Sequence, residues 1–271
     1  MNDHVTRRVF LGRLAGVAGA SAMASSAATG YAAPAIQASI PWTPIGFSQV
    51  GVPLSVYHLG TGPTRVLVLG GQHGGPEANT TDLANRLMQH FLDTTSDLPS
   101  GLTLDILADA NPDGSAAGIR QYLSGVDPNR NWGGPDWQSD AYDSNGRFLL
   151  GLGGSEPFSE QETRALADWM LQTRPALTVN YHSAGGFMFG ARDGVAGELT
   201  SLYSGASGYP VPTPGGGSSP LSYRASGSLN VWARGMGLNT LFIELSTPYV
   251  AEFDRNLAGL RAVLPRLATR G

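Results

Sequence analysis

Two histidines and a glutamate could together hold a metal ion, because their residue types match a known catalytic zinc set. His73 and Glu77 lie in a glycine-rich stretch that follows one apolar run, and His182 follows another. Two imidazoles and a carboxylate leave one coordination position of Zn2+ for a water molecule. The sequence therefore predicts a zinc site at His73, Glu77 and His182.

A second carboxylate, Glu244, lies in the middle of the apolar segment Leu241 to Leu245. An unpaired charge is costly to bury, so this side chain needs a partner. A metal-bound water would be one, since a nearby carboxylate can take its proton and later pass that proton to a leaving amine. We therefore predict that Glu244 is the catalytic base.

The polar segment Asp127 to Trp132 presents one arginine, Arg130, in a turn. A guanidinium is a planar fork of donors that can bind a carboxylate through two parallel hydrogen bonds. An ordinary surface arginine is the alternative interpretation. The segment makes Arg130 a candidate for binding a substrate carboxylate.

Each candidate ligand has a plain structural explanation when it is taken alone. A histidine can simply fill a core or loop position, and Glu77 suits the first turn of a helix because of the helix dipole. However, only four histidines follow the first 35 residues, and two of them lie in glycine-flanked turns at predicted strand ends. This combination favours a site.

Strands must position these side chains. The short, continuous apolar run Val66 to Gly70 is typical of a strand buried on both faces, and Leu177 to Tyr181 and Leu241 to Leu245 are further predicted strands. Ligands in open α/β sheets bind at the carboxyl ends of the strands. We therefore expect His73 and His182 to point toward one common rim.

The remaining pattern predicts a single α/β domain without repeats. Glycine- and proline-rich segments separate the expected elements, and a capping box at Ser159 and Glu162 is expected to start one of the helices. We expect an edge hairpin over 45–58, helices over 77–92, 159–172 and 253–267, a strand over 102–108, a turn at 111–114, and loops over 133–157 and 204–220.

Residues 1–35 are predicted to form a twin-arginine export signal. Arg7 and Arg8 precede an apolar run from Leu14 to Ala28, and small residues follow it. The run is rich in Gly, Ala and Ser and lacks the roughly 20 strongly apolar residues that a membrane span needs. We expect the twin-arginine machinery to export the protein to the periplasm or the medium, without a membrane anchor once the signal is removed.

Composition excludes several classes of protein. The chain has no cysteine, which rules out disulfides, thiolate metal sites and cysteine nucleophiles. Residues 36–271 carry 14 basic and 20 acidic side chains, so no basic surface for nucleic acid is expected. No Gly-x-Ser-x-Gly sequence marks a serine hydrolase. A metal-activated water remains the best nucleophile.

Together these segments resemble the M14 metallocarboxypeptidases, the carboxypeptidase A-like class, in register from about Ile45 to Glu252. The resemblance implies a mixed, mostly parallel twisted sheet flanked by helices, in one phosphorylase/hydrolase-like catalytic domain over residues 36–271. It also implies a zinc-dependent enzyme.

In that family a glycine-flanked His and Glu and a strand-end His hold the zinc, and a strand glutamate is the base. The resemblance therefore implies the same residues that the chemistry indicates: His73, Glu77, His182 and Glu244. One departure is the spacing, because the family usually has two residues between the first His and the Glu, and this chain has three. The adjoining glycines are expected to absorb the extra residue.

Other segments of the chain resemble the family's substrate-binding elements. By this resemblance Asn129 and Arg130 bind the free carboxylate, and Arg120 polarises the scissile carbonyl and stabilises the oxyanion. Tyr223 closes over the bound substrate. Leu229, in the segment that shapes the specificity pocket, implies a preference for an apolar or neutral side chain.

The expected reaction is hydrolysis of a C-terminal bond in a peptide or a murein stem peptide that carries a free carboxylate. One alternative is deacylation of N-acyl amino acids on the same fold. Another is a non-catalytic module that binds peptide C-termini through Arg130, although such a module does not need a buried base.

Overall fold

The computed structural model describes residues 40–212, 221 and 223–269. The predicted signal, residues 1–35, lies outside the described residues, as does part of the loop predicted over 204–220.

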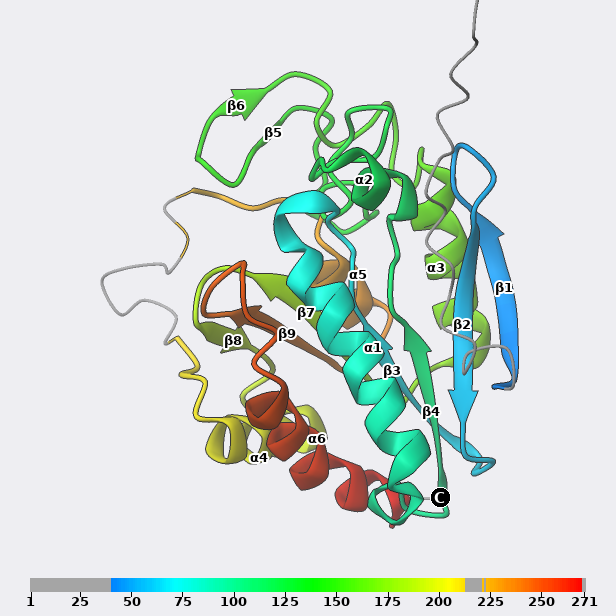
Figure 1. Ribbon diagram of the computed structural model, residues 1–271. Coiled ribbons are helices and arrows are strands. Elements are labelled where there is room, and N and C mark those ends of the chain that lie inside the picture. Colours follow the sequence, from blue (N-terminus) through cyan, green and yellow to red (C-terminus); the bar gives the residue numbers. More distant parts are fainter. Residues whose placement is uncertain (1–39, 213–220, 222, 270–271) are drawn as a thin grey trace, which may run out of the picture. The chain divides into compact units, whose positions relative to one another are not determined.

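A seven-stranded mixed sheet forms the centre of the molecule (Figure 1). Its four middle strands run parallel, and antiparallel pairs flank them on both sides. The predicted mixed sheet is confirmed, and its parallel part is confined to the middle. The spatial order is β1 (Trp42–Phe47), β2 (Pro53–Leu59), β4 (Leu102–Leu107), β3 (Thr64–Leu69), β7 (Leu177–Ser183), β9 (Thr240–Leu245) and β8 (Phe187–Phe189).

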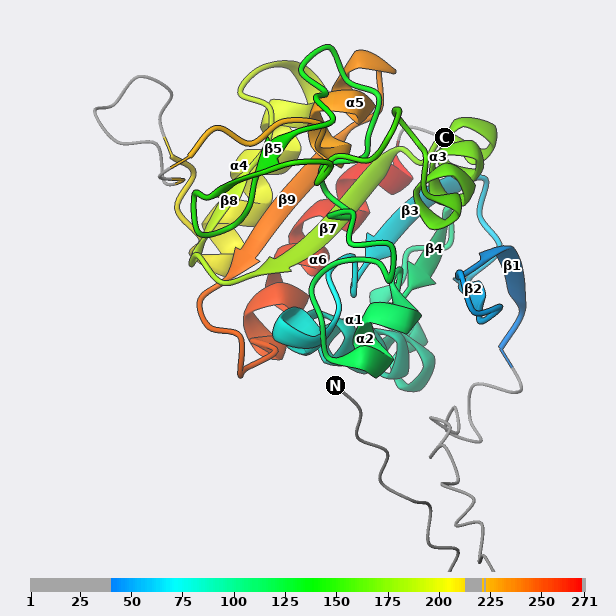
Figure 2. The ribbon, with the colours of Figure 1, turned by 90° about the horizontal axis from the view of Figure 1, so that it is seen from above.

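Helices cover both faces of this sheet (Figure 2). One face packs against α1 (Ala78–Asp93), α4 (Gly194–Ser207) and α6 (Phe253–Ala268). The other face packs against α3 (Gln161–Thr173) and α5 (Leu229–Gly235). The smaller elements are the helix α2 (Pro112–Ala117), the 3-10 turns η2 (Gly75–Glu77) and η3 (Thr95–Asp97), and the two-stranded ribbon of β5 (Ala141–Tyr142) and β6 (Phe148–Leu149).

The apolar run of β3 is buried on both faces, as its sequence predicts. Val66 and Val68 join the core under α1 and α6, while Leu67 and Leu69 join the core under α3 and α5. Successive side chains of a strand point to opposite faces. An uninterrupted apolar run is therefore what a strand between two helical layers requires.

Two predicted boundaries are wrong for local reasons. The turn expected at 111–114 begins α2, because the Asn111 side chain caps that helix by accepting a hydrogen bond from the Gly114 amide at 3.0 Å. The expected capping box does not form, since the Ser159 hydroxyl donates to Glu160 at 2.9 Å and α3 starts two residues later, at Gln161.

The loop predicted over 204–220 also starts too early. Residues Ser204 to Ser207 are the last turn of α4, a helix rich in Gly and Ser that the sequence pattern does not indicate. Tertiary packing explains this helix, because Tyr203 is fully buried and its hydroxyl bonds to Asn256 of α6 at 2.9 Å. Among the described residues, no helix is both long and apolar enough to cross a bilayer.

Close packing of α4 on α6 leads to a test of the fold. A Cβ added at Gly259 would lie 2.5 Å from the ring of Tyr203, whereas one added at Gly205 would meet nothing within 4 Å. We expect Gly259→Ala to lower the free energy of unfolding by about 1–2 kcal/mol, because overpacking exceeds the gain in helix propensity. Gly205→Ala, the matched control in α4, should raise it by about 0.5–1 kcal/mol. Urea unfolding measures both, and equal effects would contradict this packing.

Candidate metal centre and catalytic site

The candidate residues meet at the carboxyl ends of the parallel strands, as the sequence predicts. His73 follows β3, His182 lies near the end of β7, and Glu244 lies near the end of β9. His182 and Glu244 are direct register partners on the neighbouring strands β7 and β9. The sheet therefore places one candidate ligand and the candidate base side by side.

The glycines next to His73 absorb the extra residue in the His73–Glu77 spacing. Gly75 has a φ of +22°, and the chain tightens into the 3-10 turn η2 before α1 begins. A Cβ on Gly74 or Gly75 would lie 2.3 Å from backbone atoms of the α2 region. The turn therefore requires glycine at both positions, and it carries Glu77 back toward His73.

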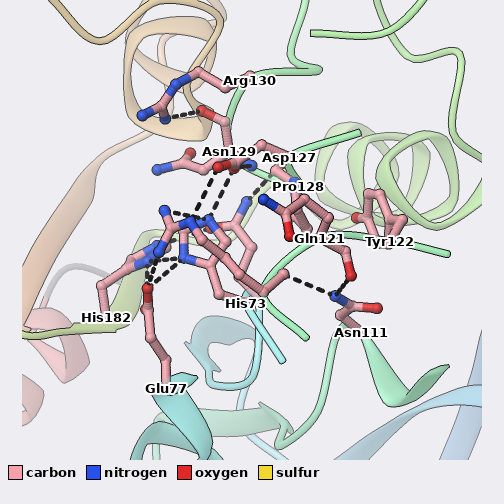
Figure 3. Close-up of polar contacts among 12 residues, drawn as sticks. His73, Glu77, Asn111, Gln121, Tyr122, Asp127, Pro128, Asn129, Arg130 and His182 are labelled. Atoms are coloured by element: carbon pink, nitrogen blue, oxygen red, sulfur yellow. Dashed lines mark hydrogen bonds and ion pairs between the residues drawn. The ribbon is translucent and has the colours of Figure 1, made fainter. Parts of the chain in front are cut away.

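Three donor groups converge at one buried point (Figure 3). His73 Nδ1 lies 2.8 Å from Glu77 Oε1, and His182 Nδ1 lies 3.1 Å from Glu77 Oε2. The two Nδ1 atoms are 3.0 Å apart. All three side chains are at least 97% buried, with exposed fractions of 1%, 3% and 1%.

Two further charged residues surround this point. Asp127 is fully buried, and its carboxylate lies 2.9 Å from His73 Nε2 and 3.1 Å from Arg120 Nε. The Arg120 guanidinium also contacts the Glu77 carboxylate. It approaches His73 Nε2 as well, at 2.9 Å, but an always-charged guanidinium can only donate, so the Asp127 carboxylate is the acceptor that pairs with this ring N–H. Asp127 thus orients the ring with Nδ1 toward Glu77.

The environment sets the charge of each candidate ligand. Burial lowers the pKa of His182 to about 4, so its imidazole is neutral at pH 7. Burial opposes ionisation of Glu77, but the charges of His73 and Arg120 outweigh it and hold the pKa of this carboxyl well below its usual range. Burial and the charge of Arg120 act to lower the pKa of His73. The charges of Glu77 and Asp127 outweigh them, so the net effect is a raised pKa. A bound metal would displace a proton there.

This donor set fits zinc. Neutral imidazole nitrogen and ionised carboxylate oxygen are ligands that Zn2+ takes, and three protein ligands leave a position for water or substrate. A carboxylate that accepts from the other nitrogen of a ligand histidine is the usual outer partner in such sites. The residues present could therefore hold one zinc ion.

Glu244 is partly buried next to this cluster. Burial and the charge of Glu77 raise its pKa to about 7. No hydrogen bond to its carboxylate is found in the described part of the chain. A carboxylate with a pKa near neutrality is suited to exchanging protons with water and with a leaving group.

The predicted carboxylate-binding residues lie in the loop that follows α2. Arg130 is 2% exposed, and its Nε and Nη1 donate to backbone carbonyls at 3.0 and 2.8 Å. Its Nη2 is buried and has no hydrogen-bond partner among the described residues. The guanidinium carbon lies 5.6 Å from the ring centre of Tyr223, so these two residues are neighbours. An unpaired buried donor is suited to a ligand acceptor.

Two of the predicted substrate-binding residues are engaged within the protein. The side chain of Leu229 is fully buried in the core cluster that also contains Trp132 and Trp232, and its expected role in specificity stays a prediction. Its backbone N–H donates to Asn129 Oδ1 at 3.0 Å. Asn129 therefore also ties the loop to the first residue of α5.

Two residues at the site, Asp127 and Gln72, were not predicted to be functional from the sequence. Asp127 lies two residues before the predicted Asn129–Arg130 pair, and Gln72 directly precedes His73. Each contacts a candidate metal ligand, since Asp127 lies 2.9 Å from His73 Nε2 and Gln72 Oε1 lies 2.9 Å from His182 Nε2. The only sequence signal is that each of them lies within two residues of a residue already identified as a candidate.

Comparison with known proteins agrees with this geometry. A family model described as zinc carboxypeptidase matches residues 42–192, more than half of the chain. Murein peptide amidase A of Escherichia coli K12 is 27% identical over 184 residues, covering 66% of this chain and 69% of that protein. The matched region includes His73, Glu77 and His182 but ends before Glu244.

Solved structures share the fold. The murein-tripeptide amidase of Escherichia coli O157 aligns with a TM-score of 0.63 at 22% identity, covering 87% of this chain and 96% of that one. Bovine thrombin-activatable fibrinolysis inhibitor aligns with a TM-score of 0.71 at 17% identity, covering 86% and 91%. Carboxypeptidase A of Helicoverpa armigera aligns with a TM-score of 0.67 at 20% identity, covering 86% and 69%.

The fold and the site together define a metallopeptidase-type hydrolase. The chain belongs to the zinc carboxypeptidase family, M14. The resemblance found in the sequence is thereby confirmed at the level of family, fold and reaction class.

The raised pKa of Glu244 predicts a pH-dependent stability in the zinc-free protein. Because the folded pKa of about 7 exceeds the ordinary 4.5, the folded state holds this proton more tightly than the unfolded state, and stability falls as pH rises through that interval. We expect zinc-free Glu244→Gln to be more stable than wild type at pH 8 by up to about 3 kcal/mol, and about equally stable at pH 4.5. Urea unfolding in a chelator checks this. A stability difference that is the same at both pH values would refute the expectation.

Proposed function

We propose that this protein is a zinc-dependent hydrolase that cleaves an amide bond next to a residue with a free carboxylate. The observation that carries the proposal is the convergence of His73, Glu77 and His182 at a buried point, with Glu244 on the adjoining strand. A purely structural cluster does not require three potential metal-ligating atoms to lie within 4.8 Å of one another.

In the proposed mechanism the three converging residues, His73, Glu77 and His182, would hold the ion. When bound, zinc lowers the pKa of a coordinated water and polarises the scissile carbonyl. Glu244 accepts the proton of the attacking water at its carboxylate and donates it to the leaving nitrogen. The raised pKa of Glu244 suits it for both transfers.

Positively charged side chains would bind the rest of the substrate. Arg120, which contacts Glu77 and Asp127, lies beside the proposed metal position and would stabilise the oxyanion. Arg130 would offer its unpaired Nη2 to the free carboxylate, with Asn129 at the same loop. Tyr223, adjacent to Arg130, would cover the bound residue.

Murein stem peptides are the substrate class that we propose to test first, with ordinary peptide C-termini second. The support is the 27% identity to a protein named murein peptide amidase A, together with the predicted export signal. Such peptides carry the free carboxylates that a buried arginine suits.

The first test is zinc content and hydrolysis in the mature protein. We expect about one zinc per chain by elemental analysis, and release of an amino-acid product from a murein tripeptide or a C-terminal dipeptide. Glu77→Ala should lose the zinc and reduce kcat/KM at least a thousandfold, because it removes a ligand whose loss disorders the ion.

The control for this test is Glu156→Ala, which changes an exposed glutamate and should leave both readouts unchanged. An N-acyl amino acid tested in parallel separates peptide hydrolysis from deacylation. Wild-type protein that stays metal-free after reconstitution with zinc would disprove the proposal.

We also propose that residues 1–35 direct export by the twin-arginine route, which would place the enzyme in the periplasm or outside the cell. The support is the Arg7-Arg8 pair before an apolar run of moderate hydropathy. Export in the folded state would allow the enzyme to acquire its zinc before it leaves the cytoplasm.

Replacing both arginines tests this route. We expect a reporter fused to residues 1–40 to be exported, and the double variant Arg7→Lys, Arg8→Lys to be retained in the cytoplasm, because the pair is read as a receptor signal and lysine keeps only its charge. Fractionation of cells measures the distribution. Unchanged export of the double variant would argue for the general secretory route instead.

A further inference from the structure

We propose that Gln72 is a positioning residue that keeps the proton of His182 on Nε2 and thereby aims Nδ1 at the metal. The inference rests on the proposed zinc function. It is drawn from the hydrogen bonds around a single buried amide.

Gln72 is 2% exposed, and both ends of its side-chain amide form hydrogen bonds within the protein. Its Oε1 lies 2.9 Å from His182 Nε2 and 2.9 Å from Asn180 Nδ2. Its Nε2 lies 3.2 Å from the carbonyl oxygen of Pro128. The amide therefore bridges the strand β7 and the loop that follows α2.

The Pro128 carbonyl decides which way the amide faces. A carbonyl oxygen can only accept, so the NH2 group of Gln72 must face Pro128 and its oxygen must face His182. That oxygen can only accept as well, so His182 Nε2 must be the donor. A neutral imidazole carries one N–H, which leaves Nδ1 with a free lone pair.

His182 Nδ1 is the nitrogen that faces the proposed metal position, 3.1 Å from Glu77. Asp127 imposes the same arrangement on His73, by accepting from its Nε2. Two consecutive residues, Asp127 and Pro128, thus set both rings, one directly and one through Gln72. The same loop continues into Arg130, the candidate for binding the substrate carboxylate.

Stability alone does not account for the pair formed by Gln72 and Asn180. Asn180 is fully buried, and its Nδ2 is committed to Gln72, while its Oδ1 has no hydrogen-bond partner among the described residues. An unpaired buried acceptor costs about 1–3 kcal/mol. Two apolar side chains of similar shape would avoid that cost, but they could not accept the proton of His182.

The test compares Gln72→Leu, which has no acceptor, with Gln72→Glu, whose carboxylate still accepts from Nε2. Zinc dissociation constants from chelator competition should rise 10- to 100-fold for Gln72→Leu, as for the loss of other outer partners of metal ligands. Gln72→Glu keeps the acceptor but loses the N–H that faces the Pro128 carbonyl, so its zinc dissociation constant should rise less than that of Gln72→Leu. The matched control Gln161→Leu removes an exposed glutamine whose side chain donates to the Phe47 carbonyl, at 2.9 Å, and should change nothing.

The second readout needs no zinc. In zinc-free protein at pH 8, ring 15N chemical shifts of His182, assigned with His182→Gln, should show the Nε2–H tautomer in wild type and Gln72→Glu. Gln72→Leu should show an Nδ1–H population. If Gln72→Leu does not fold, Gln72→Glu decides alone, because an Nδ1–H tautomer there would overturn the proposal.

The outcomes separate the two proposals. Wild-type zinc affinity together with an unchanged Nε2–H tautomer in Gln72→Leu would overturn the role of Gln72 and leave the zinc site intact. Wild-type protein that binds no zinc would instead refute the proposed function, while the tautomer measurement would still test Gln72.

Discussion

Repulsion among acceptors at one buried point governs the architecture of the site. The Nδ1 atoms of two imidazoles and the carboxylate of Glu77 face one another within about 3 Å, with Glu244 on the next strand adding to the negative potential. Such a group is stable only around a cation. Arg120 and the proton on His73 supply positive charge in the zinc-free protein, and an ion with free coordination positions would supply more.

The construction of the site divides into two halves. The half proposed to hold the metal is built on the sheet: β3 leads into the glycine turn, β7 carries His182, and β9 carries Glu244. The half proposed to bind substrate is built on loops, with Asn129 and Arg130 in one of them and Tyr223 in another. Asp127 and Pro128 join the halves, because they lie in the substrate loop and contact the metal half.

Sequence patterns predict the parts of this structure that depend on local rules. The buried runs of β3, β7 and β9, the helices α1 and α6, and the edge hairpin of β1 and β2 follow from periodicity and apolar content. The glycines that accommodate the His73–Glu77 spacing follow from backbone sterics. What could not be predicted depends on distant contacts: α4 is held by packing on α6, and Leu229 belongs to the core although its segment suggested a pocket.

The pairing of His182 with Glu244 across adjacent strands has a consequence for how such an enzyme can diversify. Their separation is fixed by the lateral spacing of two hydrogen-bonded strands, about 4.8 Å, and not by the length or composition of any loop. Insertions and substitutions in the surrounding loops can therefore alter what is recognised without displacing Glu244 from the proposed metal ligand His182. The residues proposed for the chemical step and those proposed for substrate binding therefore lie on separate segments of the backbone.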